Sequence, residues 1–102
     1  MELTKEIIEE LAVKFVDDCS NDKEQEIELD LGHGHIYLTA ILSWEQEYKI
    51  WTDRFIEPEY IISDILATVK DITYIDKNYN ETEYGIKEDT EMEMALIEEL
   101  RE

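Results

Sequence analysis

The chain has 102 residues with one cysteine, and its 28 acidic against nine basic residues give a formal net charge of −19. Its length predicts one acidic domain over residues 1–102, with no internal disulfide. No apolar run approaches the roughly 18 residues that span a bilayer, and the first residues lack a secretory signal pattern, so we expect a cytoplasmic protein. Such a charge opposes direct contact with nucleic acid or anionic membranes and favours basic proteins as partners.

The first element is an amphipathic helix, predicted over residues 4–19. Thr4 stands at the N-cap position, and Leu3 and Ile8 stand at the two positions of a hydrophobic staple. Cys19 belongs to the apolar stripe, so we interpret it as a buried structural thiol rather than a nucleophile. The whole stripe has helical spacing and consists of Leu3, Ile7, Ile8, Leu11, Ala12, Phe15, Val16 and Cys19.

Two strands joined by a tight turn are predicted next. Alternation places one apolar set on a single face, namely Ile27, Leu29, Leu31, Ile36, Leu38, Ala40, Leu42 and Trp44. A two-residue turn at His33-Gly34, with a positive φ at Gly34, pairs Leu31 with Ile36 and keeps that set together. The spacing therefore predicts a β-hairpin.

The middle of the chain is predicted to hold a third strand and a second helix. The strand covers residues 48–56 and follows a short turn at 45–47. Pro58 suits the first turn of a helix. The apolar stripe of that helix is Ile61, Ile62, Ile65, Leu66, Val69 and Ile72.

The last third is predicted to be irregular chain followed by a helix. Residues 73–87 contain a short strand at 73–75 or at 82–86. A capping box from Thr90 to Glu93 begins a helix that continues through Leu100, with Met92, Leu96, Ile97 and Leu100 inward. The fold class is therefore α+β, a three-stranded or four-stranded antiparallel sheet packed against helices, in the order αβββα plus a C-terminal helix.

Two short motifs have the spacing of cation ligands. His33 and His35 could share a face of a strand, as in zinc and copper sites, but the hairpin places His33 at the turn. Residues 76–80 (DKNYN) resemble the start of an EF-hand loop, but Glu81 and Lys87 occupy positions that require glycine and a bidentate glutamate. We interpret both motifs as loops and expect no metal and no cofactor. A cation-binding module is the weakest of three functional hypotheses.

Acidic residues gather in two stretches of the sequence. Residues 17–30 contain seven and residues 81–102 contain nine. Averaged over roughly 6,000 Å² of surface, one net charge falls on about 320 Å², against about 110 Å² in duplex DNA. The protein could match the charge density of DNA only if its carboxylates crowd onto one face.

The leading hypothesis is a non-catalytic acidic domain that binds a basic protein by mimicking nucleic acid. No phosphate-binding glycine loop and no Ser/His/Asp arrangement is present, so we expect no enzymatic activity. The alternative is a structural or adaptor domain that docks or dimerises through exposed aromatics or a sheet edge, with acidity serving only solubility. The predicted partner-binding residues are Asp17, Asp18, Asp22, Glu24, Glu26, Glu28, Asp30, Glu81, Glu83, Tyr79 and Tyr84.

Overall fold

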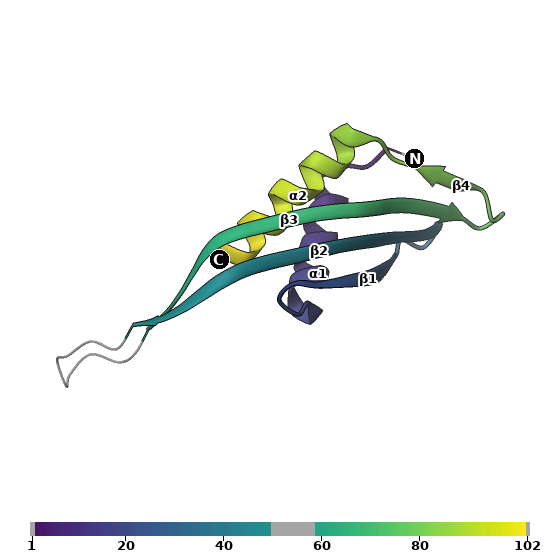
Figure 1. Ribbon diagram of the computed structural model, residues 1–102. Coiled ribbons are helices and arrows are strands. Elements are labelled where there is room, and N and C mark those ends of the chain that lie inside the picture. Colours follow the sequence, from purple (N-terminus) through teal and green to yellow (C-terminus); the bar gives the residue numbers. More distant parts are fainter. Residues whose placement is uncertain (1, 50–58, 102) are drawn as a thin grey trace.

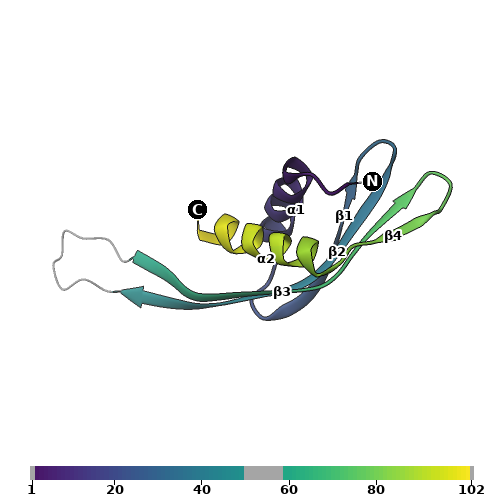
Figure 2. The same ribbon diagram turned by 90° about the horizontal axis from the view of Figure 1, so that it is seen from above.

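A computed structural model describes residues 2–49 and 59–101, which form a four-stranded sheet with helices on one side (Figures 1 and 2). The sheet is an antiparallel meander with the strand order β1-β2-β3-β4. This arrangement confirms the predicted α+β class. In chain order the elements are α1 (Lys5–Asp18), β1 (Lys23–Asp30), β2 (Gly34–Lys49), β3 (Glu59–Asp76), β4 (Glu81–Glu83) and α2 (Ile86–Arg101).

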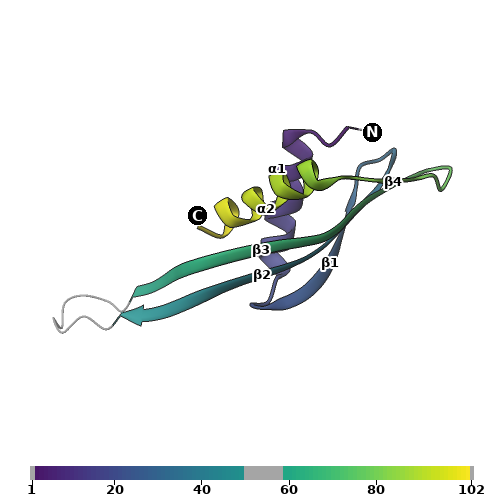
Figure 3. The ribbon, with the colours of Figure 1, turned by 45° about the horizontal axis from the view of Figure 1, so that its top comes forward.

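A single hydrophobic core lies between the helices and the sheet. The side chains that both layers bury are Ile8, Leu11, Ala12, Phe15, Ile36, Leu38, Ala40, Leu42, Ala67, Val69, Ile72, Tyr74, Met92 and Leu96. Both described helices lie on the same side of the sheet, where α2 runs alongside β3 and α1 passes behind the strands (Figures 2 and 3). Neither has the length and apolar character that a bilayer-spanning helix needs. The part of the sheet under the helices therefore has one buried face and one face without helices, and the far ends of β2 and β3 extend beyond the helices (Figures 1 and 2).

Helix α1 agrees with its prediction to within one residue at each end. The Thr4 hydroxyl oxygen accepts a hydrogen bond from the Ile7 N–H at 3.3 Å, which confirms Thr4 as the N-cap. Cys19 follows the helix, and its thiol donates to the Val16 carbonyl at 3.4 Å. Cys19 is half-buried rather than fully buried as predicted, and this partial burial raises the pKa of its thiol.

The β1–β2 hairpin forms, but its register differs from the prediction by two residues. Leu29, rather than Leu31, pairs with Ile36. The positive φ of 85° belongs to Gly32, whose N–H donates to the Asp30 carboxylate at 2.8 Å, so the turn lies one residue earlier than predicted. Because the shift is an even number of residues, the predicted apolar set keeps its face.

Gly34 is required because its backbone lies close to Tyr74 and Ile75 of β3, and not because of its φ. A Cβ at this position would lie 2.6 Å from the Ile75 carbonyl oxygen and 2.6 Å from the Tyr74 hydroxyl. Replacing Gly34 with alanine should therefore lower the free energy of unfolding by about 1–3 kcal/mol, the usual cost of overpacking. Urea unfolding followed by circular dichroism measures this loss.

Gly85 provides the matched control for the Gly34 prediction. A Cβ at Gly85 would meet only the Glu88 carboxylate, at 3.7 Å. Gly85→Ala should cost about 0.5 kcal/mol, the difference between glycine and alanine at an N-cap. Equal losses for the two variants would contradict the close approach at Gly34.

The predicted helix after Pro58 is wrong, because the described part of that segment is the long strand β3. The predicted turn at 45–47 is also wrong, since β2 continues through it to Lys49. Pro58 and most of the predicted strand 48–56 lie outside the described residues.

Two β-bulges explain why β3 has a helix-like sequence. Consecutive residues of β2 pair with Val69 and Asp71, which leaves Lys70 as an extra residue in β3. A second irregularity lies at Asp64, which has a positive φ of 51°. An extra residue moves the apolar positions that follow to the other parity of the strand. The buried Val69 and Ile72 are therefore three residues apart and imitate a helical stripe.

The sequence predicts one short strand, at 73–75 or at 82–86, and the structure has a strand at the first position and at Glu81–Glu83, which overlaps the second. Residues 73–75 form the end of β3, and β4 pairs with them antiparallel, Tyr74 standing opposite Thr82. The sheet therefore has four strands, which is the larger of the two predicted numbers.

Helix α2 begins four residues before the predicted start, so the predicted capping box is wrong. Thr90 lies inside the helix, where its hydroxyl donates to the Ile86 carbonyl at 2.9 Å. The Glu88 carboxylate instead accepts from the Gly85 N–H at 3.2 Å, which makes Gly85 the N-cap. The predicted inward residues Met92 and Leu96 are buried.

Candidate functional site

The sheet face opposite the helices carries a regular array of carboxylates. Cross-strand pairing places one row as Glu28, Tyr37, Thr73 and Glu83, and the next row as Asp30, His35, Ile75 and Glu81. We call this surface the open face. Its seven carboxylates are all on described strands or their ends and belong to Glu24, Glu26, Glu28, Asp30, Asp71, Glu81 and Glu83.

The carboxylates of the open face lie mainly along its two edges. Strands β1 and β4 form the edges of the sheet and carry all of them except Asp71. With strands about 4.8 Å apart, the two edges are separated by about 14 Å. Between them runs a half-buried and largely uncharged stripe that contains Tyr37, Thr39, Thr73 and Ile75.

On the flat area of the strand lattice, the carboxylates of the open face are more closely spaced than the charges on the surface of DNA. The whole molecule exposes 7215 Å², or about 380 Å² for each of its 19 net charges. A strand rise of about 3.3 Å and a strand spacing of about 4.8 Å give the paired rows an area of about 450 Å², or about 65 Å² per carboxylate. Duplex DNA has about 110 Å² per charge. The fold therefore provides the crowding that the average charge lacks.

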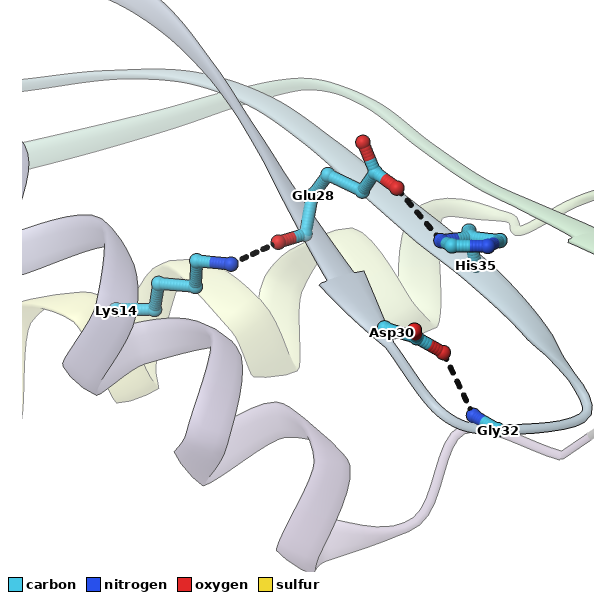
Figure 4. Close-up of polar contacts among 5 residues, drawn as sticks. All are labelled: Lys14, Glu28, Asp30, Gly32 and His35. Carbon is cyan, nitrogen blue, oxygen red and sulfur yellow. Dashed lines mark hydrogen bonds and ion pairs between the residues drawn. The ribbon is translucent and has the colours of Figure 1, made fainter.

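Few basic side chains lie near the open face, and one of them, Lys77, lines a hollow at the turn end of that face. The paired strand positions named above hold no lysine or arginine in the part of the chain that the structure describes, and Lys70 is the exposed extra residue of the bulge. His35 Nδ1 lies 2.6 Å from the Glu28 carboxylate (Figure 4). Lys14 reaches from α1 only to the backbone carbonyl oxygen of Glu28 (Figure 4). The array thus stays strongly anionic.

Three predicted partner-binding acids lie away from the open face. Asp17 and Asp18 are in the last turn of α1, and Asp17 lines a shallow groove on the helix side with Glu6 and Glu10. Asp22 lies in the connection to β1, with a φ of 60° and its N–H donating to the Leu42 carbonyl at 3.0 Å. The predicted set is therefore divided between two sides of the molecule.

The two predicted tyrosines also separate. Tyr79 is 87% exposed in the β3–β4 turn. Tyr84 alternates to the helix side and packs against the core, where burial raises the pKa of its hydroxyl. Sequence reasoning missed Asp71 and Tyr37, which share the open face with Tyr79. Alternation in the second strand signals Tyr37, whereas Asp71 requires the pairing of β3.

The two histidines engage different partners. The Tyr74 hydroxyl, on the helix side of the sheet, lies 2.7 Å from His33 Nδ1 and donates to the His33 carbonyl at 3.2 Å. His35 meets Glu28 on the open face. Their imidazoles therefore do not converge. Among the described residues, no group of three or more His, Cys, Asp or Glu side chains is arranged to hold a metal ion.

The DKNYN segment is organised as a turn around Asp76. The Asp76 carboxylate accepts hydrogen bonds from the Asn78 N–H at 2.8 Å and the Asn80 N–H at 3.0 Å. These hydrogen bonds lower the pKa of Asp76, because they favour the charged carboxylate. The oxygens that an EF-hand would use for calcium here hold the backbone of the turn.

Asp89 lies between α2 and β3, where its surroundings disfavour the charged form of its carboxylate. Its Oδ1 is buried and has no hydrogen-bond partner among the described residues. Burial raises the pKa of Asp89, and the negative charges of Glu93, Asp71 and Glu88 raise it further. Glu93 in turn accepts a hydrogen bond from the Val69 N–H at 3.0 Å. Ionised Asp89 therefore opposes the packing of α2 on the sheet.

Replacing Asp89 with asparagine should raise the free energy of unfolding at pH 7 by about 1 kcal/mol. A buried polar atom without a partner costs about 1–3 kcal/mol and more when it is charged, so asparagine, which keeps the oxygen, removes only the part of the cost that is due to charge. The loss of a favourable helix-dipole contact returns about 0.3–1 kcal/mol. Because the folded pKa is raised, the stabilisation from protonated Asp89 is complete below pH 3.8 and is lost as the pH rises through the folded value. Urea unfolding at pH 3 and pH 7 tests this, since the variant should gain stability only at pH 7.

The control for Asp89 is Glu91→Gln, at an exposed position of the same helix. This variant should change the free energy of unfolding by less than about 0.5 kcal/mol at either pH. A gain as large as that of Asp89→Asn would show that general charge relief, rather than the buried oxygen, is responsible.

Comparisons with known proteins give the chain no relatives. No protein-family model, no curated protein and no solved structure matches it. The function must therefore be inferred from the chemistry of the open face.

Proposed function

We propose that this chain is a non-catalytic acidic domain that binds a basic protein through its open face, at the site where that protein holds nucleic acid. The observation that carries the proposal is the density of about 65 Å² per carboxylate, higher than the about 110 Å² per charge of duplex DNA. These carboxylates lie on a sheet face that no described helix covers.

The spacing of the carboxylates also suits a nucleic-acid-binding surface. Along β1, alternate acids from Glu24 to Asp30 recur about every 6.6 Å. Because they are held by strand pairing, they present charge at fixed positions, as a nucleic-acid backbone does. A lysine-rich or arginine-rich groove would release counterions when either ligand binds, and its affinity for either should fall steeply with salt.

The adaptor alternative receives less support from the surface. The described large apolar side chains that are exposed lie on different elements, namely Val13 on α1, Ile62 and Leu66 on β3, Tyr79 in a turn, and Ile86 and Met94 on α2. A contiguous apolar patch would favour this alternative, because such patches mark docking surfaces. An adaptor of this kind would also keep its affinity at high salt.

A competition experiment tests the proposed function. A fluorescent 20-base-pair duplex is bound to a basic protein that recognises DNA without sequence preference, and the acidic chain is titrated in. We expect displacement of the duplex at 50 mM salt, together with a direct affinity for the basic protein that falls at least tenfold by 200 mM salt. Absence of displacement, or a direct affinity that is indifferent to salt, would overturn the proposal.

A further inference from the structure

Two shallow hollows meet on the open face. The first, of about 380 Å³, lies between the β1–β2 and β3–β4 turns and is lined by His35, Tyr37, Ile75 and Tyr79 among others. The second, of about 300 Å³, is surrounded by four carboxylates, those of Glu26, Asp71, Glu81 and Glu83. Tyr37 and Ile75 line both hollows. An aromatic hollow therefore adjoins an acidic one.

Tyr79 is held at the rim of the aromatic hollow by a built turn. It has a φ of 64°, in the left-handed region, and its N–H donates to the Asp76 carbonyl at 3.0 Å. The Asp76 carboxylate accepts from the N–H groups on both sides, at Asn78 and Asn80. An 87% exposed aromatic on so constrained a backbone loses little entropy when a partner covers it.

The combination of tyrosine rings and carboxylates distinguishes the two basic side chains. A guanidinium is planar, stacks on aromatic faces and pairs with carboxylates through two parallel hydrogen bonds. An ammonium is a compact and strongly hydrated charge that gains less from both contacts. Exposed cation–π contacts contribute about 0.5–1 kcal/mol each, which corresponds to about twofold to fivefold in affinity.

We propose that the open face selects arginine over lysine in its partner, taking a guanidinium against Tyr79 and Tyr37 while neighbouring cations pair with the carboxylates of the second hollow. This inference rests on the proposed function and specifies the chemistry of the partner segment. Charge complementarity points to a cationic protein, and the adjoining aromatic hollow points to arginine as its anchoring residue.

Lys77 is the basic side chain that lines the aromatic hollow. Its ammonium repels an incoming cation of either kind. Lys77→Gln should therefore strengthen binding of arginine and lysine peptides by a similar factor, of about twofold. A gain for one peptide alone would mean that Lys77 itself determines the selectivity.

Two peptides of equal length and charge, deca-arginine and deca-lysine, test the inference. Fluorescence anisotropy at 100 mM salt should give the arginine peptide about a tenfold tighter Kd for the natural chain. Tyr79→Asn removes the ring but suits the left-handed backbone, and it should reduce this preference to about threefold or less. Tyr37→Leu should act in the same direction, whereas Glu83→Gln, which leaves both rings in place, should weaken both peptides and keep most of the preference for arginine.

The outcomes separate the two proposals. If both peptides bind equally, or if the preference for arginine survives in both tyrosine variants, the inference about arginine is overturned while the proposed function stands. If neither peptide binds at 100 mM salt, the proposed function itself fails. Circular dichroism of each variant establishes that the fold is retained.

Discussion

Replacing Ile72 with alanine should lower the free energy of unfolding by about 2–5 kcal/mol, whereas Leu66→Ala should cost less than about 1 kcal/mol. Ile72 is 1% exposed and belongs to the core, whereas Leu66 is 62% exposed on the other face of the same strand. Urea unfolding monitored by circular dichroism measures both losses. For a domain whose total stability is about 5–15 kcal/mol, the Ile72 variant would be unfolded to a large extent at moderate urea.

This pair of variants discriminates between a strand and a helix for residues 59–72. In the predicted helix, both side chains belong to one apolar stripe, so the two alanine variants should lower the free energy of unfolding by similar amounts. In β3 the bulge at Lys70 places them differently, Ile72 facing the helices and Leu66 facing away. Equal losses for the two variants would contradict the observed register.

The elements that the sequence predicts well are those set by local chemistry. Helix α1 is predicted by one apolar stripe and by Thr4, whose hydroxyl caps the helix by accepting a hydrogen bond from the N–H three residues later, at Ile7. Alternation in β1 likewise predicts which acids point away from the core. Both signals act over a few residues, so they need no knowledge of what packs against them.

The elements that the sequence predicts badly depend on distant partners. A bulge in β3 exists only relative to β2, and the helix-like spacing of Val69 and Ile72 cannot be interpreted without it. The hairpin register depends on which glycine takes the positive φ, which is Gly32, whereas Gly34 lies close to Tyr74 and Ile75 of β3. Tertiary context therefore overrides the local pattern at these positions.

The candidate site shows the same division. Regular alternation identifies the β1 row of the open face, because every second residue from 24 to 30 is acidic. Asp71, the carboxylate between the two edge rows, belongs to the segment predicted as a helix, so its position could not be inferred. Tyr84 is predicted to bind a partner because its neighbours in the sequence are acidic. In the structure it follows Glu83 of β4, so its side chain points to the opposite face of the sheet and packs against the core.

Neutralising four carboxylates of the open face should weaken binding to a basic protein about thirtyfold. The variant carries glutamine at Glu24, Glu26, Glu81 and Glu83, which removes four of the 19 net negative charges. Each exposed ion pair contributes about 0.2–1 kcal/mol, so four lost pairs correspond to about 2 kcal/mol. Fluorescence anisotropy with the same basic DNA-binding protein, from 50 to 200 mM salt, should also give a shallower dependence of log Kd on log salt concentration.

A second quadruple variant separates the position of charge from its amount. Glutamine at Glu9, Glu10, Glu91 and Glu98 removes the same four charges from exposed positions on the helix side. At 0.1 M salt the screening length is about 10 Å, so these charges act weakly across the molecule and their loss should weaken binding less than threefold. If both quadruple variants lose affinity equally, the partner responds to net charge alone. The open face then has no special role, because a partner that recognises an ordered array of carboxylates must respond to where the charges lie as well as to their number.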